Sequence, residues 1–318
     1  MFRMYDPETL KSVQKAEAGI LKDFDRVCEK YGIHYFLDGG TLLGAVRHQG
    51  FIPWDDDLDV GMTRENYERF KQIMPQELGA DYVLATPATH EGYCSAVIKL
   101  MKKGTKFVPQ FSVEMKCWLG IYIDIFVWDN LSDKKVKAWL QMKEARILSQ
   151  LLFLCGSSKP EIPYHGAKKL IAQGICKSLH FLLSRIPGSE RRLYRRFEKI
   201  SQQENNKTTQ YITSFQVVDI YNHSFKESDS VPYGKMKFED FRASVPNNWE
   251  AYLHRCYGDF MSLPPEEKRV NHCAEIIDLG GGGRFVCNNY PYMTEKTYMK
   301  CCRKLDKRSM NFKIQRMG

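Results

Sequence analysis

The chain has 318 residues, of which 43% are hydrophobic and 13% aromatic, and its formal net charge is +9. This composition excludes a disordered chain and allows one large domain or two ordinary ones with real cores. The positive charge favours an acidic partner such as a nucleotide, a phosphorylated glycan or an anionic lipid. No arginine-rich repeat or RNA-binding aromatic signature indicates nucleic acid, which we therefore exclude as a partner.

The chain shows no targeting or membrane-spanning pattern. Its first residues lack the basic-then-apolar layout of a secretory signal, and no apolar run approaches the roughly 20 residues needed to span a bilayer. We therefore expect a cytoplasmic protein. Its ten cysteines form no C-x-x-C pair, so buried free thiols are expected rather than zinc ligands or disulfides.

The first third of the chain alternates helix and strand patterns. Apolar residues recur every three or four positions from Leu10 to Tyr31, which predicts an amphipathic helix. A short strand is expected at residues 32–38 because apolar and more polar residues alternate there. The further expected elements are a helix at 41–48, a strand at 57–62, a helix at 63–74 capped by Thr63, and strands at 82–85, 96–101 and 121–128. This alternation predicts a small α/β unit with a mixed sheet.

A Gly-Gly-Thr turn, Gly39 to Thr41, follows the first predicted strand. Two glycines let the backbone turn and approach a ligand closely, and the amides at the start of the next helix attract anions. Thr41 adds a hydroxyl group. The turn alone is a weak signal, but with the carboxylates that follow it predicts a phosphate-binding loop.

Four Asp stand among the five residues 55–59. Carboxylates this close repel one another unless a cation lies between them. Residues two apart on a strand project from the same face, so Asp57 and Asp59 are predicted to point together while Leu58 enters the core. Paired carboxylates suit Mg²⁺ or Mn²⁺, and Mg²⁺ typically takes one or two carboxylates plus substrate phosphate oxygens.

The best candidate for a third carboxylate is Asp124. It is a single charge inside the apolar run 120–128, and a buried Asp needs a partner or a metal. A surface or strand-edge Asp is the alternative. We therefore predict Asp57, Asp59 and Asp124 as the catalytic carboxylates and metal ligands.

Three further residues are candidates for substrate binding, each with an alternative. Arg47 could contact phosphate oxygens with a two-pronged hydrogen bond or hold the Asp cluster structurally. Lys99 could neutralise a leaving nucleotide, or it could be a solvated strand end. Trp54 could offer its ring face to a quaternary ammonium group, although core packing is favoured for any single Trp, including Trp118 and Trp128.

The rest of the chain reads as a helical stretch and a C-terminal segment. Helices are expected at 136–154, 166–184 and 191–203, and core packing of their dense apolar runs is favoured over insertion at a membrane interface. From about residue 210 short strands return, followed by a helix near 248–258. The predicted division is a catalytic core (1–130), a helical subdomain (131–209) and a segment completing the core (210–318), with a basic tail from about 284.

Three stretches of the sequence are distinctive: FLDGGTLLGAVRHQGFIPWDDDLDVGM (residues 36–62), IDIFVWD (123–129) and YGDFMSLPPEEKR (257–269). Together they resemble the LicD family of phosphocholine transferases, within the nucleotidyltransferase superfamily. The family pattern at the second stretch is often DIFPLD, and this chain has Val127 and Trp128 where that pattern has Pro and Leu. The Asp is kept, so the departure concerns the local shape of the site and not its chemistry.

The resemblance implies a metal-dependent transfer of a phospho-alcohol. Typically this is phosphocholine from CDP-choline, moved to a hydroxyl of a cell-surface glycan, teichoic acid or lipopolysaccharide precursor, and relatives transfer ribitol phosphate. It implies Asp57 and Asp59 as metal ligands, Asp124 as third carboxylate and candidate base toward the acceptor hydroxyl, and Gly39 to Thr41 as the phosphate loop. A lipid-linked acceptor would place the enzyme at the inner face of the membrane, with the basic tail as its contact.

Two alternatives remain open. An ordinary nucleotidyltransferase would share the three carboxylates but attach a nucleoside monophosphate and release pyrophosphate. A non-catalytic protein that binds a nucleotide or metal would keep the fold without the reaction, and a degenerate D-x-D pair would be its expected mark.

Overall fold

The computed structural model describes residues 6–280 and 285–287, apart from residues 110, 111, 113, 116, 118, 161, 164, 270, 272 and 273. The helices are α1 (Pro7–Lys30), α2 (Gly39–His48), α3 (Arg64–Glu77), α4 (Lys135–Gly156), α5 (Gly166–Leu183), α6 (Ser189–Ser201), α7 (Glu227–Ser230) and α8 (Trp249–Tyr257). The strands are β1 (Phe36–Leu37), β2 (Asp59–Thr63), β3 (Tyr82–Ala85), β4 (Ile98–Lys102), β5 (Lys106–Val108), β6 (Tyr122–Leu131), β7 (Tyr211–Ser214), β8 (Ser224–Lys226), β9 (Gly234–Phe238), β10 (Phe241–Val245), β11 (Ile276–Asp278) and β12 (Phe285–Cys287).

A mixed sheet forms the centre of the molecule. Its strand order is β1-β2-β6-β4-β3, and β7 extends it by pairing with both β6 and β8. The pairing of β2 with β6 is parallel, whereas β4 runs antiparallel to β6. The predicted α/β fold with a mixed sheet is therefore confirmed.

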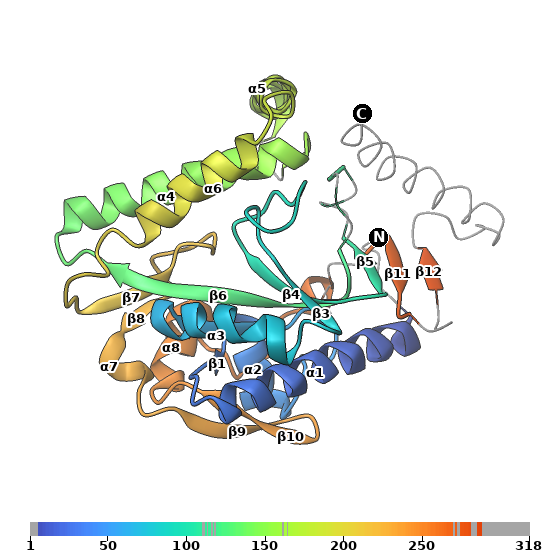
Figure 1. Cartoon of the computed structure of the whole chain (residues 1–318), viewed down its shortest axis with the longest axis vertical. Coiled ribbons are helices and arrows are strands. Elements are labelled where there is room, and N and C mark those ends of the chain that lie inside the picture. Colours follow the sequence, from blue (N-terminus) through green and yellow to red (C-terminus); the bar gives the residue numbers. More distant parts are fainter. Residues whose placement is uncertain are drawn as a thin grey trace.

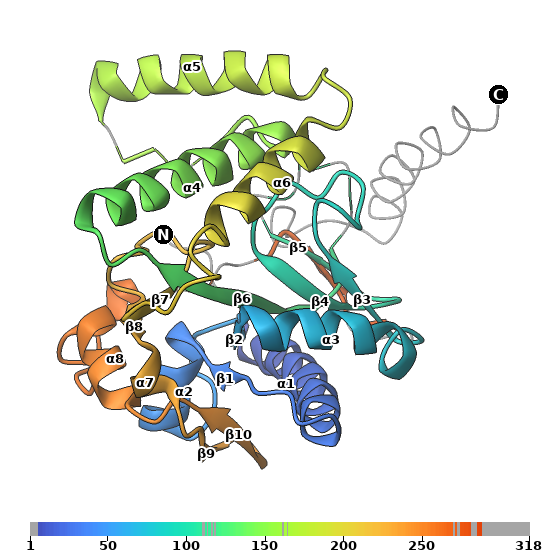
Figure 2. The ribbon, with the colours of Figure 1, turned by 60° about the vertical axis from the view of Figure 1, so that its left-hand side comes forward.

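Helices cover the sheet on both sides. Figures 1 and 2 show α1, α2, α3 and α8 on one side of β6, and α4, α5 and α6 on the other. Helix α1 buries Val13, Ile20, Phe24 and Val27 completely, as its three-to-four spacing predicts. Asp6 caps this helix by accepting a hydrogen bond from the Thr9 amide at 3.0 Å.

The helical side has a smaller core of its own. Helices α4 and α6 pack around Ala145, Leu148, Leu152, Tyr194 and Phe197, all of which are buried. Helix α5 differs, because none of its side chains is buried. The prediction that its apolar run packs into a core is therefore wrong, whereas the buried face of α4 agrees with it.

Several boundaries also differ from the sequence-based expectation. The first strand covers only residues 36–37, and α2 begins at Gly39, so the Gly-Gly-Thr turn is the first turn of the helix. Strand β2 begins at Asp59, so Asp57 lies outside the strand, in the irregular segment before it. Thr63 holds the cap position of α3 but makes no capping hydrogen bond to the backbone.

The predicted tail lies outside the described residues, as do the joint at residues 281–283 and Trp118. The cysteines that the structure describes with their side chains are all free, and Cys28, Cys94 and Cys155 among them are buried. Within the described residues, no helix combines the length and the apolar character that crossing a membrane requires.

Candidate active site

The parallel pairing of β2 and β6 brings two predicted carboxylates together. Asp59 is the register partner of Asp124, so the two residues occupy adjacent positions on neighbouring strands. The Asp124 amide donates to the Leu58 carbonyl at 2.8 Å, and Leu58 itself is completely buried. The pairing of these two strands thus brings together two residues that are 65 positions apart in the sequence.

Lys99 lies beside Asp124 on a third strand, β4. Asp59, Asp124 and Lys99 therefore form a row across β2, β6 and β4. Across the antiparallel β4–β6 pair Lys99 is the register partner of Asp124, and its Nζ lies 2.5 Å from Asp124 Oδ1. The same Nζ lies 3.4 Å from the centre of the Tyr122 ring. Lys99 is only 3% exposed, so the alternative of a solvated strand end is wrong.

The first turn of α2 lies against the carboxylates. Gly39 has a φ of +49°, and a Cβ added there would lie 3.4 Å from Asp59 Oδ2. A Cβ on Gly40 would lie 3.3 Å from Asp55 Oδ2. A Cβ would be tighter than an ordinary contact only at Gly40, whereas the positive φ is what favours glycine at position 39, and the N-terminus of α2 lies directly against the carboxylates.

Thr41 connects this turn to β2 directly. Its Oγ1 accepts a hydrogen bond from the Asp59 amide at 2.8 Å, and the residue is buried. The Asp38 amide donates to the Asp59 carbonyl at 3.0 Å. Thr41 thus fixes the backbone of a predicted catalytic residue, and its direct contact with phosphate remains a prediction.

Asp38 is a residue of the site that the sequence analysis did not single out. Its Oδ1 accepts from the Gly39 amide at 2.8 Å and from the Tyr252 hydroxyl at 2.5 Å, and its Oδ2 accepts from Trp128 Nε1 at 3.1 Å. An Asp directly before a helix is a common N-cap, which is the signal that could have found it. Trp128 is 1% exposed, so it packs in the core and offers no open ring face.

Glu17 of α1 is a second such residue. It is 1% exposed, and its Oε2 has no hydrogen-bond partner. Burial, together with the carboxylates of Asp56 and Asp57, raises the pKa of Glu17 well above its ordinary value. The detectable signal was a lone carboxylate on the apolar stripe of α1, between Val13 and Ile20.

The acidic residues also act on Asp59. Burial raises the pKa of the Asp59 carboxyl well above its ordinary value, and the carboxylates of Asp57 and Asp124 raise it further. A cation placed among these groups would oppose that shift. The predicted carboxylates therefore meet an electrostatic condition for binding a divalent ion.

The donor chemistry fits Mg²⁺ or Mn²⁺ as well, because carboxylate oxygens are hard ligands. Among the described residues, no three His, Cys, Asp or Glu side chains form a preassembled metal-binding group. Mg²⁺ does not require one, because it is commonly held by one or two carboxylates, substrate phosphates and water.

Arg47 and Trp54 lie at the C-terminal end of α2 and beyond it. Arg47 Nη1 donates to the carbonyls of Phe260 and Ser262 at 2.9 and 3.2 Å. The Arg269 guanidinium lies 5.4 Å from the centre of the Trp54 ring. Both residues thus contact the stretch 257–269, and their contact with a substrate remains a prediction.

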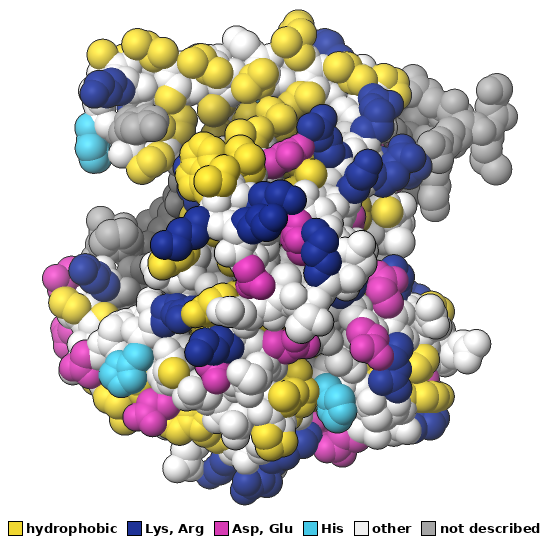
Figure 3. Space-filling model, turned by 90° about the vertical axis from the view of Figure 1, so that its left-hand side faces the viewer, with side chains coloured by type: hydrophobic (Ala, Val, Ile, Leu, Met, Phe, Trp, Pro, Cys, Tyr) yellow, Lys and Arg dark blue, Asp and Glu magenta, His cyan; other side chains and the backbone are white. Residues whose placement is uncertain are grey.

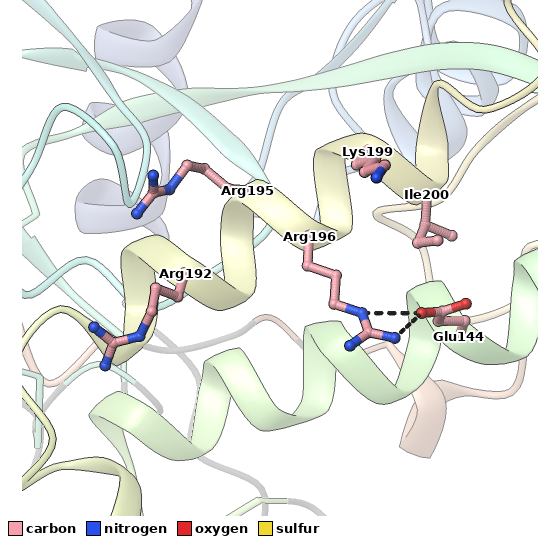
Figure 4. A pocket seen from close by; sticks show the side chains of 6 residues that line it. All are labelled: Glu144, Arg192, Arg195, Arg196, Lys199 and Ile200. Carbon is pink, nitrogen blue, oxygen red and sulfur yellow. Dashed lines mark hydrogen bonds and ion pairs between the residues drawn. The ribbon is translucent and has the colours of Figure 1, made fainter.

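A pocket of about 740 Å³ lies elsewhere, between α4 and α6. Its lining is Glu144, Arg192, Arg195, Arg196, Lys199 and Ile200. Arg196 points at Glu144 and binds it, while Arg192 and Arg195 extend from the same helix (Figure 4). The pocket contains none of the predicted site residues, so its position does not mark the carboxylate site.

Known proteins match this chain in the same region. Residues 32–153 match the family model "LicD/FKTN/FKRP, nucleotidyltransferase domain". The chain is 29% identical over 280 residues to the lipopolysaccharide cholinephosphotransferase LicD of Haemophilus influenzae, covering 83% of this chain and 96% of that protein. It is 44% identical over 54 residues to the human ribitol 5-phosphate transferase FKRP, covering 17% and 11% of the two chains. An uncharacterised Rickettsia typhi protein is 53% identical over 57 residues, 18% of each chain.

The mixed sheet, its carboxylate row and these relatives define an enzyme of the phosphotransferase class. The matched region includes Gly39 to Thr41, the carboxylates Asp57, Asp59 and Asp124, and Lys99. Residues 32–153 are a LicD-family nucleotidyltransferase domain, and the similarity to the Haemophilus LicD protein extends over most of the chain.

Proposed function

We propose that this protein transfers a phospho-alcohol, in the first instance phosphocholine from CDP-choline, to a hydroxyl of a glycan. The acceptor we propose is a cell-surface glycan precursor of the lipopolysaccharide or teichoic acid type, and the site of action is the cytoplasm. The observation that carries the proposal is the row of Asp59, Asp124 and Lys99 across three paired strands, in which Asp59 lies against the N-terminus of α2. The cholinephosphotransferase activity of the Haemophilus protein and the ribitol 5-phosphate transferase activity of FKRP support it.

Asp57 and Asp59 would hold Mg²⁺ or Mn²⁺, with Asp124 as the third carboxylate. When bound, the ion would neutralise negative charge on the donor diphosphate and on the departing nucleotide. The N-terminal amides of α2 attract the same phosphates, because the helix dipole is positive there. Thr41 keeps the Asp59 backbone in place through its hydrogen bond.

The reaction is an in-line displacement. The acceptor oxygen forms a bond to the phosphorus that bears choline, the bond from that phosphorus to CMP breaks, and CMP leaves. We assign the hydroxyl proton to the Asp124 carboxylate. Lys99 fixes the orientation of that carboxylate and compensates its charge through the 2.5 Å ion pair.

The experiment incubates purified protein with Mg²⁺, a crude glycan acceptor and one nucleotide at a time: CDP-choline, CDP-ethanolamine, CDP-ribitol, CTP or ATP. We expect CMP from one CDP-alcohol, and its loss in EDTA with recovery on adding Mg²⁺. The Asp59→Asn variant should lower CMP release by at least about 10²-fold. Asp240→Asn is the matched control, because Asp240 is an exposed carboxylate paired with Lys22.

The other products separate the alternatives. Pyrophosphate from CTP or ATP would identify an ordinary nucleotidyltransferase. No turnover of any nucleotide, with the acceptor present, would favour the non-catalytic protein. CMP release that persists in EDTA would contradict the metal assignment alone.

A further inference from the structure

Helix α5 carries its apolar side chains on the outside of the molecule. Leu170, Ile171, Ile175, Phe181 and Leu182 are each between 54% and 70% exposed. The remaining side of the helix is only half buried. This orientation is the reverse of an ordinary surface helix, whose apolar stripe faces the core.

Helix α4 adds to this apolar surface. Its residues Val136, Trp139, Leu140 and Ile147 are between 53% and 72% exposed. Figure 3 shows hydrophobic side chains gathered over the upper part of this face, with Lys and Arg side chains beside them. We call the exposed apolar residues of α4 and α5, together with Ile186 just beyond α5, the outer helical face. Soluble monomers rarely expose extended apolar patches without a binding role.

The apolar stripe of α5 is bordered by lysines. With 3.6 residues per turn, its five exposed apolar residues fall within an arc of about 140°, from Leu170 to Ile175. Lys177 and Lys168 fall at the two edges of that arc, and both are exposed. A lysine at each edge can extend its ammonium group away from an apolar phase while its stem stays in it.

The part of the chain that carries the outer helical face is strongly basic. Residues 134–186 contain ten Lys and Arg but only two Asp and Glu. The adjoining α6 pocket contributes three arginines and Lys199 against one Glu. An occupant of the outer helical face must therefore offer an apolar phase bordered by negative charge.

We propose that the outer helical face binds the surface of an anionic lipid bilayer. The apolar side chains of α4 and α5 enter the boundary between headgroups and acyl chains, and the bordering Lys and Arg contact lipid phosphates. This inference does not depend on the proposed transfer reaction. It assigns to α4 and α5 the membrane contact that the sequence suggested for the basic tail.

A second copy of the chain fits the face less well. A two-fold interface places the same patch on both partners, so the excess of positive charge on residues 134–186 would meet itself. Like charges opposed across an interface oppose association. An anionic bilayer instead supplies both the apolar phase and the opposite charge.

The test is flotation of the full chain with phosphatidylcholine vesicles, with and without phosphatidylglycerol. We expect flotation only with phosphatidylglycerol, and weaker flotation at high salt. The variant Ile171→Asp/Phe181→Asp should reduce the bound fraction by at least about tenfold, because each Asp removes an inserting side chain and repels the lipid. Both positions are exposed, so the fold should persist, as circular dichroism would verify.

Three full-chain controls identify the binding surface. Met261→Asp changes a 57% exposed apolar residue on the loop after α8 and should float like the wild type. Asp59→Asn should also float, which separates bilayer binding from headgroup binding at the carboxylate site. A tail variant, Arg303→Glu/Lys304→Glu/Lys307→Glu/Arg308→Glu, should retain most of its flotation.

Other results would overturn the proposal. Undiminished flotation of Ile171→Asp/Phe181→Asp would exclude the outer helical face, and loss confined to the tail variant would assign binding to the tail. Absence of flotation, with a wild-type dimer that this double variant converts to a monomer in light scattering, would make the face an interface between copies.

Discussion

Glu17 presents the sharpest residue-scale question, since a buried carboxyl with an unpartnered oxygen lies beside an acidic cluster. Its raised pKa means that the folded protein holds a proton that the unfolded chain releases near pH 4 to 5. The stability associated with this group is therefore complete below that pH and is lost as pH rises toward the folded pKa. Without divalent ions, the contribution of Glu17 to the stability of the wild type should fall as pH rises above about 5.

The variant Glu17→Gln tests this expectation. Gln cannot ionise and its amide can donate to neighbouring carboxylates, so we expect a gain of about 1–3 kcal/mol at pH 8 and little difference at pH 4. Urea unfolding at the two pH values, in EDTA, measures the difference. A variant less stable than the wild type at pH 8 would show that the charged carboxylate is favourable in the fold.

Lys99 is predicted to be required for stability as well as for activity. Lys99→Met leaves the Asp124 carboxylate beside Asp59 with its ion pair removed, so we expect a loss of about 3–5 kcal/mol. The double variant Lys99→Met/Asp124→Leu removes both charges and should recover much of that loss without restoring CMP release. Urea unfolding of the single and double variants measures the coupling, and additive losses would contradict it.

These residues show why part of the site could be predicted and part could not. The D-x-D pair and Asp124 stand out because carboxylates are unusual next to apolar strand residues. The partner of Asp124 depends on the register of β4 against β6, which no local pattern specifies. The Asp38 contacts with Trp128 and Tyr252 likewise depend on tertiary packing across 90 and 214 positions.

At the scale of elements, Gly39 at the start of α2 can be compared with Gly32, which follows α1 and has a similar backbone conformation. Gly39 and Gly32 have φ values of +49° and +58°, but a Cβ on Gly32 would meet nothing within 4 Å. Ala at either position should cost about 1 kcal/mol through backbone strain. Only Gly39→Ala also places a methyl group beside Asp59 Oδ2 and the Tyr257 hydroxyl.

We therefore expect similar unfolding free energies for the two variants and a loss of CMP release in Gly39→Ala alone. Parallel urea titrations and CMP assays on both proteins provide the measurement. Equal activity in the two variants would show that the close approach at Gly39 does not matter to catalysis.

Periodicity predicted the helices better than it predicted their surroundings. The limits of α1, α4, α5 and α6 agree with the expected ranges within a few residues, because a helical repeat is a local property. Whether the apolar stripe of a helix faces the core or the solvent depends instead on tertiary packing. Helix α5 has the pattern of a packed helix, yet its apolar side meets no part of the described chain that buries it.

At the scale of the whole molecule, Arg64 joins the two sides of the sheet. Its guanidinium binds Asp129 of β6 with two hydrogen bonds, at 2.9 and 2.7 Å, and Glu198 of α6 at 2.7 Å. Side-chain exposure of Asp129 is 1% and that of Arg64 is 12%. Such a buried two-pronged pair fixes geometry as well as energy.

Arg64→Met should destabilise the protein by about 3–5 kcal/mol, because it leaves the buried Asp129 and the partly buried Glu198 without their cation. Arg196→Met is the matched control, since its ion pair with Glu144 is largely exposed and should contribute less than about 1 kcal/mol. Thermal and urea unfolding of both variants provide the comparison. Equal losses would mean that burial does not distinguish the two pairs.

The hydrogen bond from Tyr252 to Asp38 has a consequence for how the enzyme is made. The predicted catalytic residues all lie within the first 124 positions, yet the cap of α2 takes its hydroxyl donor from α8. A ribosome delivers the N-terminal region first. The emerging chain therefore carries all three predicted catalytic carboxylates well before α8 can complete the hydrogen bonding of Asp38, so the predicted centre gains its final rigidity late in translation.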